Sequence, residues 1–95
     1  MANLFEDAFV GDGERCETLA SGAVRIEHIA GAATSPQGYL QDDDEWVVLL
    51  RGSAQLDVDG VRHSLVAGDW LDLPAGTPHT LVSSTPDAVW LAVHR

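Results

Sequence analysis

A glutamate and a histidine stand where the sequence could fix their side chains for acid–base or metal chemistry. Glu45 opens an apolar run over residues 45–51, and His79 follows a corner of two prolines around a glycine, residues 74–78. Proline lacks a backbone N–H and glycine tolerates positive φ, so this corner interrupts a regular strand and fixes the position of the imidazole. A carboxylate and an imidazole can act together as an acid–base pair, and both can bind metals.

The spacing around His79 resembles the second signature motif of the cupin superfamily. That motif places a glycine, a proline, a second glycine and a histidine at fixed intervals, and this sequence matches it with Gly68, Pro74, Gly76 and His79. Ser83 stands where the motif has an asparagine. The resemblance implies an all-β fold, a cupin-type jelly-roll β-barrel, with His79 pointing into its mouth.

The first cupin motif is only half present. Glu45 and the glycine seven residues later match its second part, but Tyr39 and Gln41 replace its two histidines. The alternative spacing of the motif would put Gly38 and Leu40 there, and neither offers a side-chain ligand. The resemblance also implies that Glu45 and His79 lie close together, with Gln41 beside them.

The metal site of the family, three imidazoles and one carboxylate, is therefore degraded. What remains is Gln41, Glu45 and His79, with Asp42 or Asp43 as further donors. A tight transition-metal site normally has at least three protein ligands, and a neutral amide oxygen suits these metals poorly. We expect at most weak binding of a divalent metal such as Zn, Fe, Ni or Mn, and favour a metal-free barrel.

Four consecutive acidic residues, 42–45, allow two interpretations. The favoured one is a solvated loop tip from which only Glu45 turns inward. The other is a calcium or magnesium site with oxygen ligands, but the alternating ligand spacing of an EF-hand loop is absent.

Composition narrows the class of partner. The net charge is −10, and all five basic residues are arginine, which argues against nucleic acid and anionic membranes as partners. Cys16 is the only cysteine, so no intrachain disulfide can form. With no basic segment ahead of an apolar run at the start, we expect a cytoplasmic protein.

Short strands separated by turn signals run through the sequence, and no stretch has a helical period. Asp59-Gly60 is a strong two-residue hairpin signal. The pattern predicts one domain over residues 1–95, with residues 1–13 peripheral and a loop at residues 31–38. The predicted strands cover residues 15–19, 23–30, 45–51, 54–58, 61–65, 70–73, 79–82 and 88–94.

The remaining histidines and the tryptophans are weaker candidates for a site. His28, His63 and His94 are expected to have core or surface roles, although His94 could line the pocket. The tryptophans at positions 46, 70 and 90 are interpreted as core or interface anchors. Residues 46–50 are apolar on both faces of their strand, which predicts a homodimer.

Two classes of function remain open. The favoured one is a cupin domain that binds a small molecule of unassigned identity. The alternative is a small metal-dependent enzyme, of isomerase, lyase or dioxygenase type, with Glu45 and His79 as catalytic candidates. The candidate ligand-binding residues are Tyr39, Gln41, Glu45, His79 and Ser83.

Overall fold

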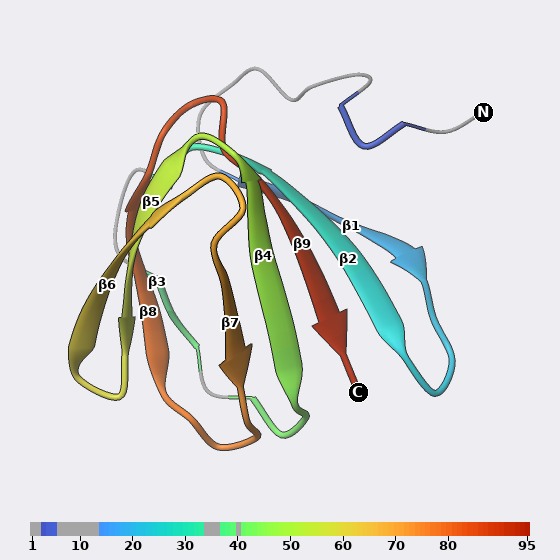
Figure 1. The fold of residues 1–95 in the computed structure, drawn as a ribbon. Coiled ribbons are helices and arrows are strands. Elements are labelled where there is room, and N and C mark those ends of the chain that lie inside the picture. The colour runs from blue at the N-terminus through green and yellow to red at the C-terminus, as the bar shows by residue number, and fades with distance from the viewer. Residues whose placement is uncertain (1–2, 6–13, 34–36, 40) are drawn as a thin grey trace.

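Strands dominate the computed structural model, which describes residues 3–5, 14–33, 37–39 and 41–95 (Figure 1). They form two antiparallel sheets that face each other, the all-β jelly-roll architecture predicted from the sequence. The described residues contain no helix, and so none that could span a membrane.

The two sheets combine strands that lie far apart in the sequence. The five-stranded sheet has the order β1 (Glu14–Ala20), β2 (Arg25–Gly31), β9 (Val89–His94), β4 (Glu45–Arg51) and β7 (Trp70–Leu73). The four-stranded sheet has the order β3 (Gln37–Tyr39), β8 (His79–Ser84), β5 (Ser53–Val58) and β6 (Val61–Val66). The pairings between these strands are all antiparallel, and the strand order brings side chains from remote segments next to one another.

The local signals explain the hairpin between β5 and β6. Asp59 and Gly60 have φ values of 48° and 82°, the left-handed conformation that a two-residue type I′ turn requires. The loop prediction for residues 31–38, in contrast, is wrong at both ends. β2 continues through Gly31, and β3 begins at Gln37, where it pairs with β8. The small residues of this segment carry no alternation, so its pairing could not be read locally.

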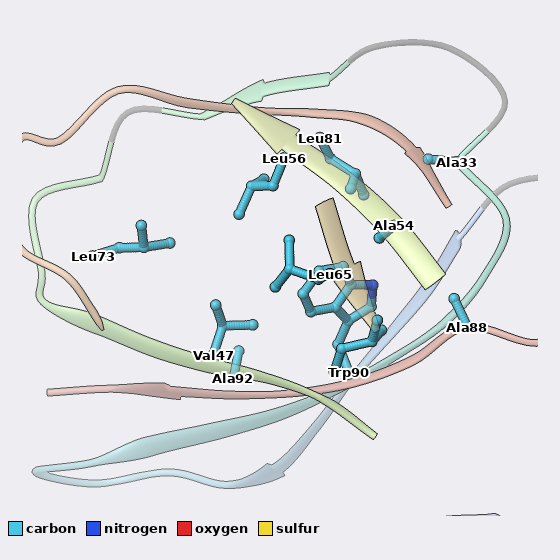
Figure 2. Packing of buried hydrophobic residues seen from close by; sticks show 11 residues of the cluster. Ala33, Val47, Ala54, Leu56, Leu65, Leu73, Leu81, Ala88, Trp90 and Ala92 are labelled. Carbon is cyan, nitrogen blue, oxygen red and sulfur yellow. The ribbon is translucent and has the colours of Figure 1, made fainter. Parts of the chain in front are cut away.

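The core lies between the sheets. On β4, Val47 and Leu49 are buried while Trp46, Val48 and Leu50 are partly exposed, because successive side chains of a strand point to opposite faces. Figure 2 shows the side chains of both sheets meeting in this space. The cluster consists of Ala33, Val47, Leu49, Ala54, Leu56, Leu65, Leu73, Leu81, Ala88, Trp90 and Ala92.

Apolar side chains also occupy the outer face of the five-stranded sheet. Trp46 and Trp70 pair there with ring centroids 5.9 Å apart, and Trp70 is 59% exposed. His28 lies on the same face, the one opposite to the face of Glu27, and is buried there, outside the core between the sheets. Trp90, in contrast, belongs to the inner core.

Candidate functional site

A cavity of about 300 Å³ lies between the two sheets. Its apolar lining consists of Ile29, Val47, Leu56, Leu73, Leu81 and Trp90. Its polar lining consists of Glu14, Cys16, Arg25, Glu27, Gln41, Glu45, His79 and His94. A concave, largely apolar space with a few convergent polar groups is the usual form of a small-molecule site.

Strand register explains why the polar residues gather there. Across β2, β9 and β4, Arg25 lies opposite His94 and His94 lies opposite Glu45, so the three form one row on the inner face. In the next row inward, Ala92 separates Glu27 from Val47. The small side chain of Ala92 at the centre of the sheet fills little of the space between the sheets.

Glu45 and His79, the pair named from the sequence, lie close together. The Nε2 atom of His79 is 3.7 Å from the Oε1 atom of Glu45, and both side chains are less than one-tenth exposed. The other ring nitrogen of His79, Nδ1, is 3.1 Å from the carbonyl oxygen of Thr77, in the corner before β8. Donation from Nδ1 to this carbonyl directs Nε2 toward Glu45, at a distance slightly beyond a hydrogen bond.

Two oxygens at this end of the cavity are buried without a hydrogen-bond partner among the described residues. They are Oε1 of Glu45 and Oε1 of Gln41. Burial raises the pKa of Glu45, and His94, His79 and a hydrogen bond from Gln41 only partly oppose that rise. A buried acceptor that lacks a donor costs free energy, which a bound molecule with N–H or O–H groups would recover.

The raised pKa of Glu45 leads to a prediction about stability. In metal-free protein, Glu45→Gln should raise the free energy of unfolding at neutral pH, because it removes a buried charge. The gain should be small below the ordinary carboxyl pKa of 4.5 and grow as pH rises through the folded-state pKa, since only the ionised form is penalised. Urea unfolding of both proteins between pH 4 and pH 8 measures this difference.

The control for this prediction is Glu17→Gln, which removes the same charge from an exposed position on β1. If Glu45→Gln gave no gain at neutral pH, or a gain that shrank as pH rose, the buried carboxylate would not be costly.

A second cluster, which the sequence did not reveal, adjoins the first. The Oε1 atom of Glu27 is 2.9 Å from both Nε2 of His94 and Nε of Arg25, and its Oε2 atom accepts a hydrogen bond of 2.6 Å from Cys16. The Nδ1 atom of His94 is 3.3 Å from Oδ1 of Asp43. Burial alone would raise the pKa of Glu27, but these donors outweigh burial and lower it.

Cys16 belongs to this cluster as a hydrogen-bond donor to Glu27. Burial and the hydrogen bond to Glu27 raise the pKa of its thiol to about 12. The reactive and metal-binding form of cysteine is the thiolate, which such a thiol scarcely populates at neutral pH.

The other candidate residues from the sequence differ in their position relative to the cavity. Tyr39 lies on β3, but its side chain is outside the described residues. Ser83 does not line the cavity: the register of β8 against β5 shifts between Gln55 and Leu56, and Ser83 is exposed. His94, for which a surface or core role was favoured, does line it.

The acidic run has the arrangement of a loop tip. Asp42 and Asp44 are exposed, Asp43 is half-buried against His94, and Glu45 alone is buried. Asp44 accepts a hydrogen bond of 2.8 Å from the backbone of Ala75, which ties the tip to the corner before His79.

The family model of the cupin domain matches residues 25–94. The chain belongs to the cupin family. The match covers β2 to β9 and includes the lining residues of the cavity except Glu14 and Cys16 on β1.

Known proteins agree with this cupin assignment. A crystal structure from Ralstonia eutropha, provisionally named a mannose-6-phosphate isomerase, is 34% identical with a TM-score of 0.90 over 99% of this chain and 95% of its own. An RmlC-like cupin from Shewanella frigidimarina shares the fold alone, at 19% identity and a TM-score of 0.75 over 92% of this chain and 80% of its own. Quercetin 2,3-dioxygenase of Bacillus subtilis is 42% identical over 40 residues, which are 42% of this chain but 12% of the dioxygenase.

The cupin motifs imply a metal site of three imidazoles and one carboxylate, so the fit of the present residues matters. Within the part of the chain that the structure describes, no three or more His, Cys, Asp or Glu side chains are grouped to hold a metal ion. Gln41, Glu45 and His79 offer one amide oxygen, one carboxylate and one imidazole. These donors do not fit a tight transition-metal site, which needs three or more strong ligands.

Proposed function

We propose that this cupin domain binds a small organic molecule in the cavity between its sheets. The observation that carries the proposal is the pair of buried, unpartnered oxygens on Gln41 and Glu45, beside an apolar wall. Polar atoms at such a place fix the orientation of a ligand, while the apolar wall supplies the affinity. His79 and Gln41 are proposed to contact the ligand with Glu45, and Tyr39 stays a predicted contact.

The test is a thermal-shift screen of metabolites on chelator-treated protein, followed by calorimetry on any molecule that raises the melting temperature. A ligand present at 100 times its Kd should stabilise the fold by about 2.7 kcal/mol. Gln41→Ala should then weaken binding by roughly 5- to 150-fold, because a ligand donor loses its acceptor.

The matched control is Gln55→Ala on β5, a half-buried glutamine that is not part of the cavity lining. If Gln41→Ala and Gln55→Ala bound the ligand as the unaltered chain does, the molecule would bind elsewhere. If no metabolite raised the melting temperature, the proposal would fail.

An enzymatic role is the second candidate, and the Glu45–His79 pair favours it. Two buried groups 3.7 Å apart, one an acid and one a base, are placed to move a proton on a bound ligand. The named relatives include an isomerase and a dioxygenase, but these activities belong to those proteins. A metal-dependent reaction would need ligands beyond those the described residues group together.

We also propose that the protein is a homodimer joined through the outer face of the five-stranded sheet. The Trp46–Trp70 pair there is the kind of aromatic anchor that dominates protein interfaces. Light scattering should give twice the chain mass, and Trp70→Ser should shift it toward the monomer, whereas Val61→Ser, exposed on β6, should not. A monomeric mass for the unaltered chain at micromolar concentration would contradict the proposal.

The cytoplasmic location of the protein stays a prediction.

A further inference from the structure

The positive charge along the cavity is already matched by carboxylates. Of the described side chains that line it, Arg25 is the one that is always charged. Its Nε atom lies 2.9 Å from Glu27, and its terminal nitrogen lies 3.4 Å from Asp43. An anionic ligand would have to compete with both carboxylates for this guanidinium.

The two imidazoles are matched in the same way. His94 has Glu27 2.9 Å from one ring nitrogen and Asp43 3.3 Å from the other. The Nε2 atom of His79 lies 3.7 Å from Glu45. Neither ring therefore presents an unmatched positive charge to the cavity.

Negative charge, in contrast, is in excess. Three carboxylates line the cavity, Glu14, Glu27 and Glu45, against the single guanidinium of Arg25. Burial raises the pKa of both Glu14 and Glu45, and at Glu45 the nearby His94 and His79 only partly oppose that rise. Glu45 is 6% exposed, and its Oε1 atom has no hydrogen-bond partner among the described residues.

Apart from Nε1 of Trp90, a buried donor with no hydrogen-bond partner among the described residues, the rest of the wall suits hydrocarbon. Leu56, Leu73 and Trp90 line the same cavity, and Figure 2 shows their side chains in the space between the sheets. A volume of about 300 Å³ is at the lower end for ligand pockets and indicates a small molecule.

We propose that the ligand is a small amphipathic amine in its ammonium form, held by Oε1 of Glu45 and Oε1 of Gln41, with its hydrocarbon part against the leucines and Trp90. An ammonium group carries three N–H donors and no acceptor, so it satisfies both oxygens and supplies the missing charge. A phosphate or carboxylate ligand would instead meet a lining with three carboxylates and one guanidinium. This inference rests on the proposed binding of an organic molecule in the cavity.

The test uses molecules of one shape and different charge. Hexylamine, hexanol and hexanoate, and benzylamine, benzyl alcohol and benzoate, are titrated into chelator-treated protein by calorimetry at neutral pH, with mannose 6-phosphate as a further anion. Charged hydrogen bonds exceed neutral ones by about 1–1.5 kcal/mol, so the amines should bind roughly tenfold more tightly than their alcohols. The acids and the sugar phosphate should not bind measurably.

Two isosteric variants distinguish binding of the amine at Glu45 from the non-specific attraction of cations to a protein with a net charge of −10. Glu45→Gln should bring an amine and its alcohol to within about threefold of each other, because it removes the charged acceptor. Glu17→Gln removes the same charge from an exposed position on β1 and should leave the amine preference unchanged. An equal loss in both variants would mean only surface attraction and would overturn the inference.

Three other outcomes would also contradict the proposal of an amine ligand. If an alcohol or acid bound as tightly as its amine, the cavity would bind ligands but not select cations, and the inference alone would fail. If no amine bound while the metabolite screen found another ligand, the inference would again fail and the binding function would stand. If a divalent metal bound stoichiometrically and displaced the amine, the cation of the site would be inorganic and the inference would be wrong.

Discussion

Gly52→Ala is expected to lower the free energy of unfolding by about 2–5 kcal/mol. Gly52 has a φ of +84°, where an L side chain is strained, and a Cβ would lie against Oγ1 of Thr85 and 2.9 Å from the Cα atom of Ala88. Thr85 cannot easily yield, because its Oγ1 accepts a 3.0 Å hydrogen bond from the backbone of Ser53. Its own N–H also donates to the carbonyl of Ser53, so movement would disturb both bonds.

Gly60→Ala is the control that isolates the crowding. Gly60 has nearly the same φ, +82°, but a Cβ there would meet nothing within 4 Å. The backbone term alone, about 1–2 kcal/mol, should therefore remain. Urea denaturation of the two variants measures the difference, and equal losses would show that the turn between β4 and β5 has room to adapt.

Leu49→Ala is expected to cost about 2–5 kcal/mol of folding stability. Leu49 is 0% exposed in the core. Its backbone N–H donates a hydrogen bond to the carbonyl of Asp69, and its carbonyl accepts one from the N–H of Gly68, in the turn before β7. These hydrogen bonds limit the collapse of the surrounding structure into the space that the substitution would leave, so much of the free-energy cost of the cavity should remain.

Leu19→Ala removes the same atoms from β1, where the side chain is 44% exposed, and should cost less than about 1 kcal/mol. Chemical denaturation and melting temperature measure both variants. Similar losses at the two positions would contradict the placement of Leu49 at the centre of the core.

The part of the site that depends on fixed spacing was predictable from the sequence. The turn residues before His79 and the position of Glu45 at the start of its strand match the cupin motifs, and that resemblance implied the pair that the structure places 3.7 Å apart. The hairpin at Asp59-Gly60 was predictable for the same reason, since both residues adopt positive φ within two positions.

The cluster around Glu27 was not predictable, because its members meet only through strand pairing. The alternation of β2 puts Arg25 and Glu27 on one face, but nothing local says that this polar face turns toward the cavity. His94 joins them because β9 lies between β2 and β4. The register shift that leaves Ser83 exposed likewise arises between two strands, β5 and β8.

The position of β9 also bears on how the chain acquires its structure during synthesis. β9 pairs with β2 on one side and β4 on the other, yet its residues are translated after those of both neighbours. Until residues 89–94 leave the ribosome, β2 and β4 each expose a strand edge that can pair with another chain. The row that joins Arg25, His94 and Glu45 forms only when β9 docks, so a nascent chain should gain the complete cavity and cover the inner edges of β2 and β4 in the same step.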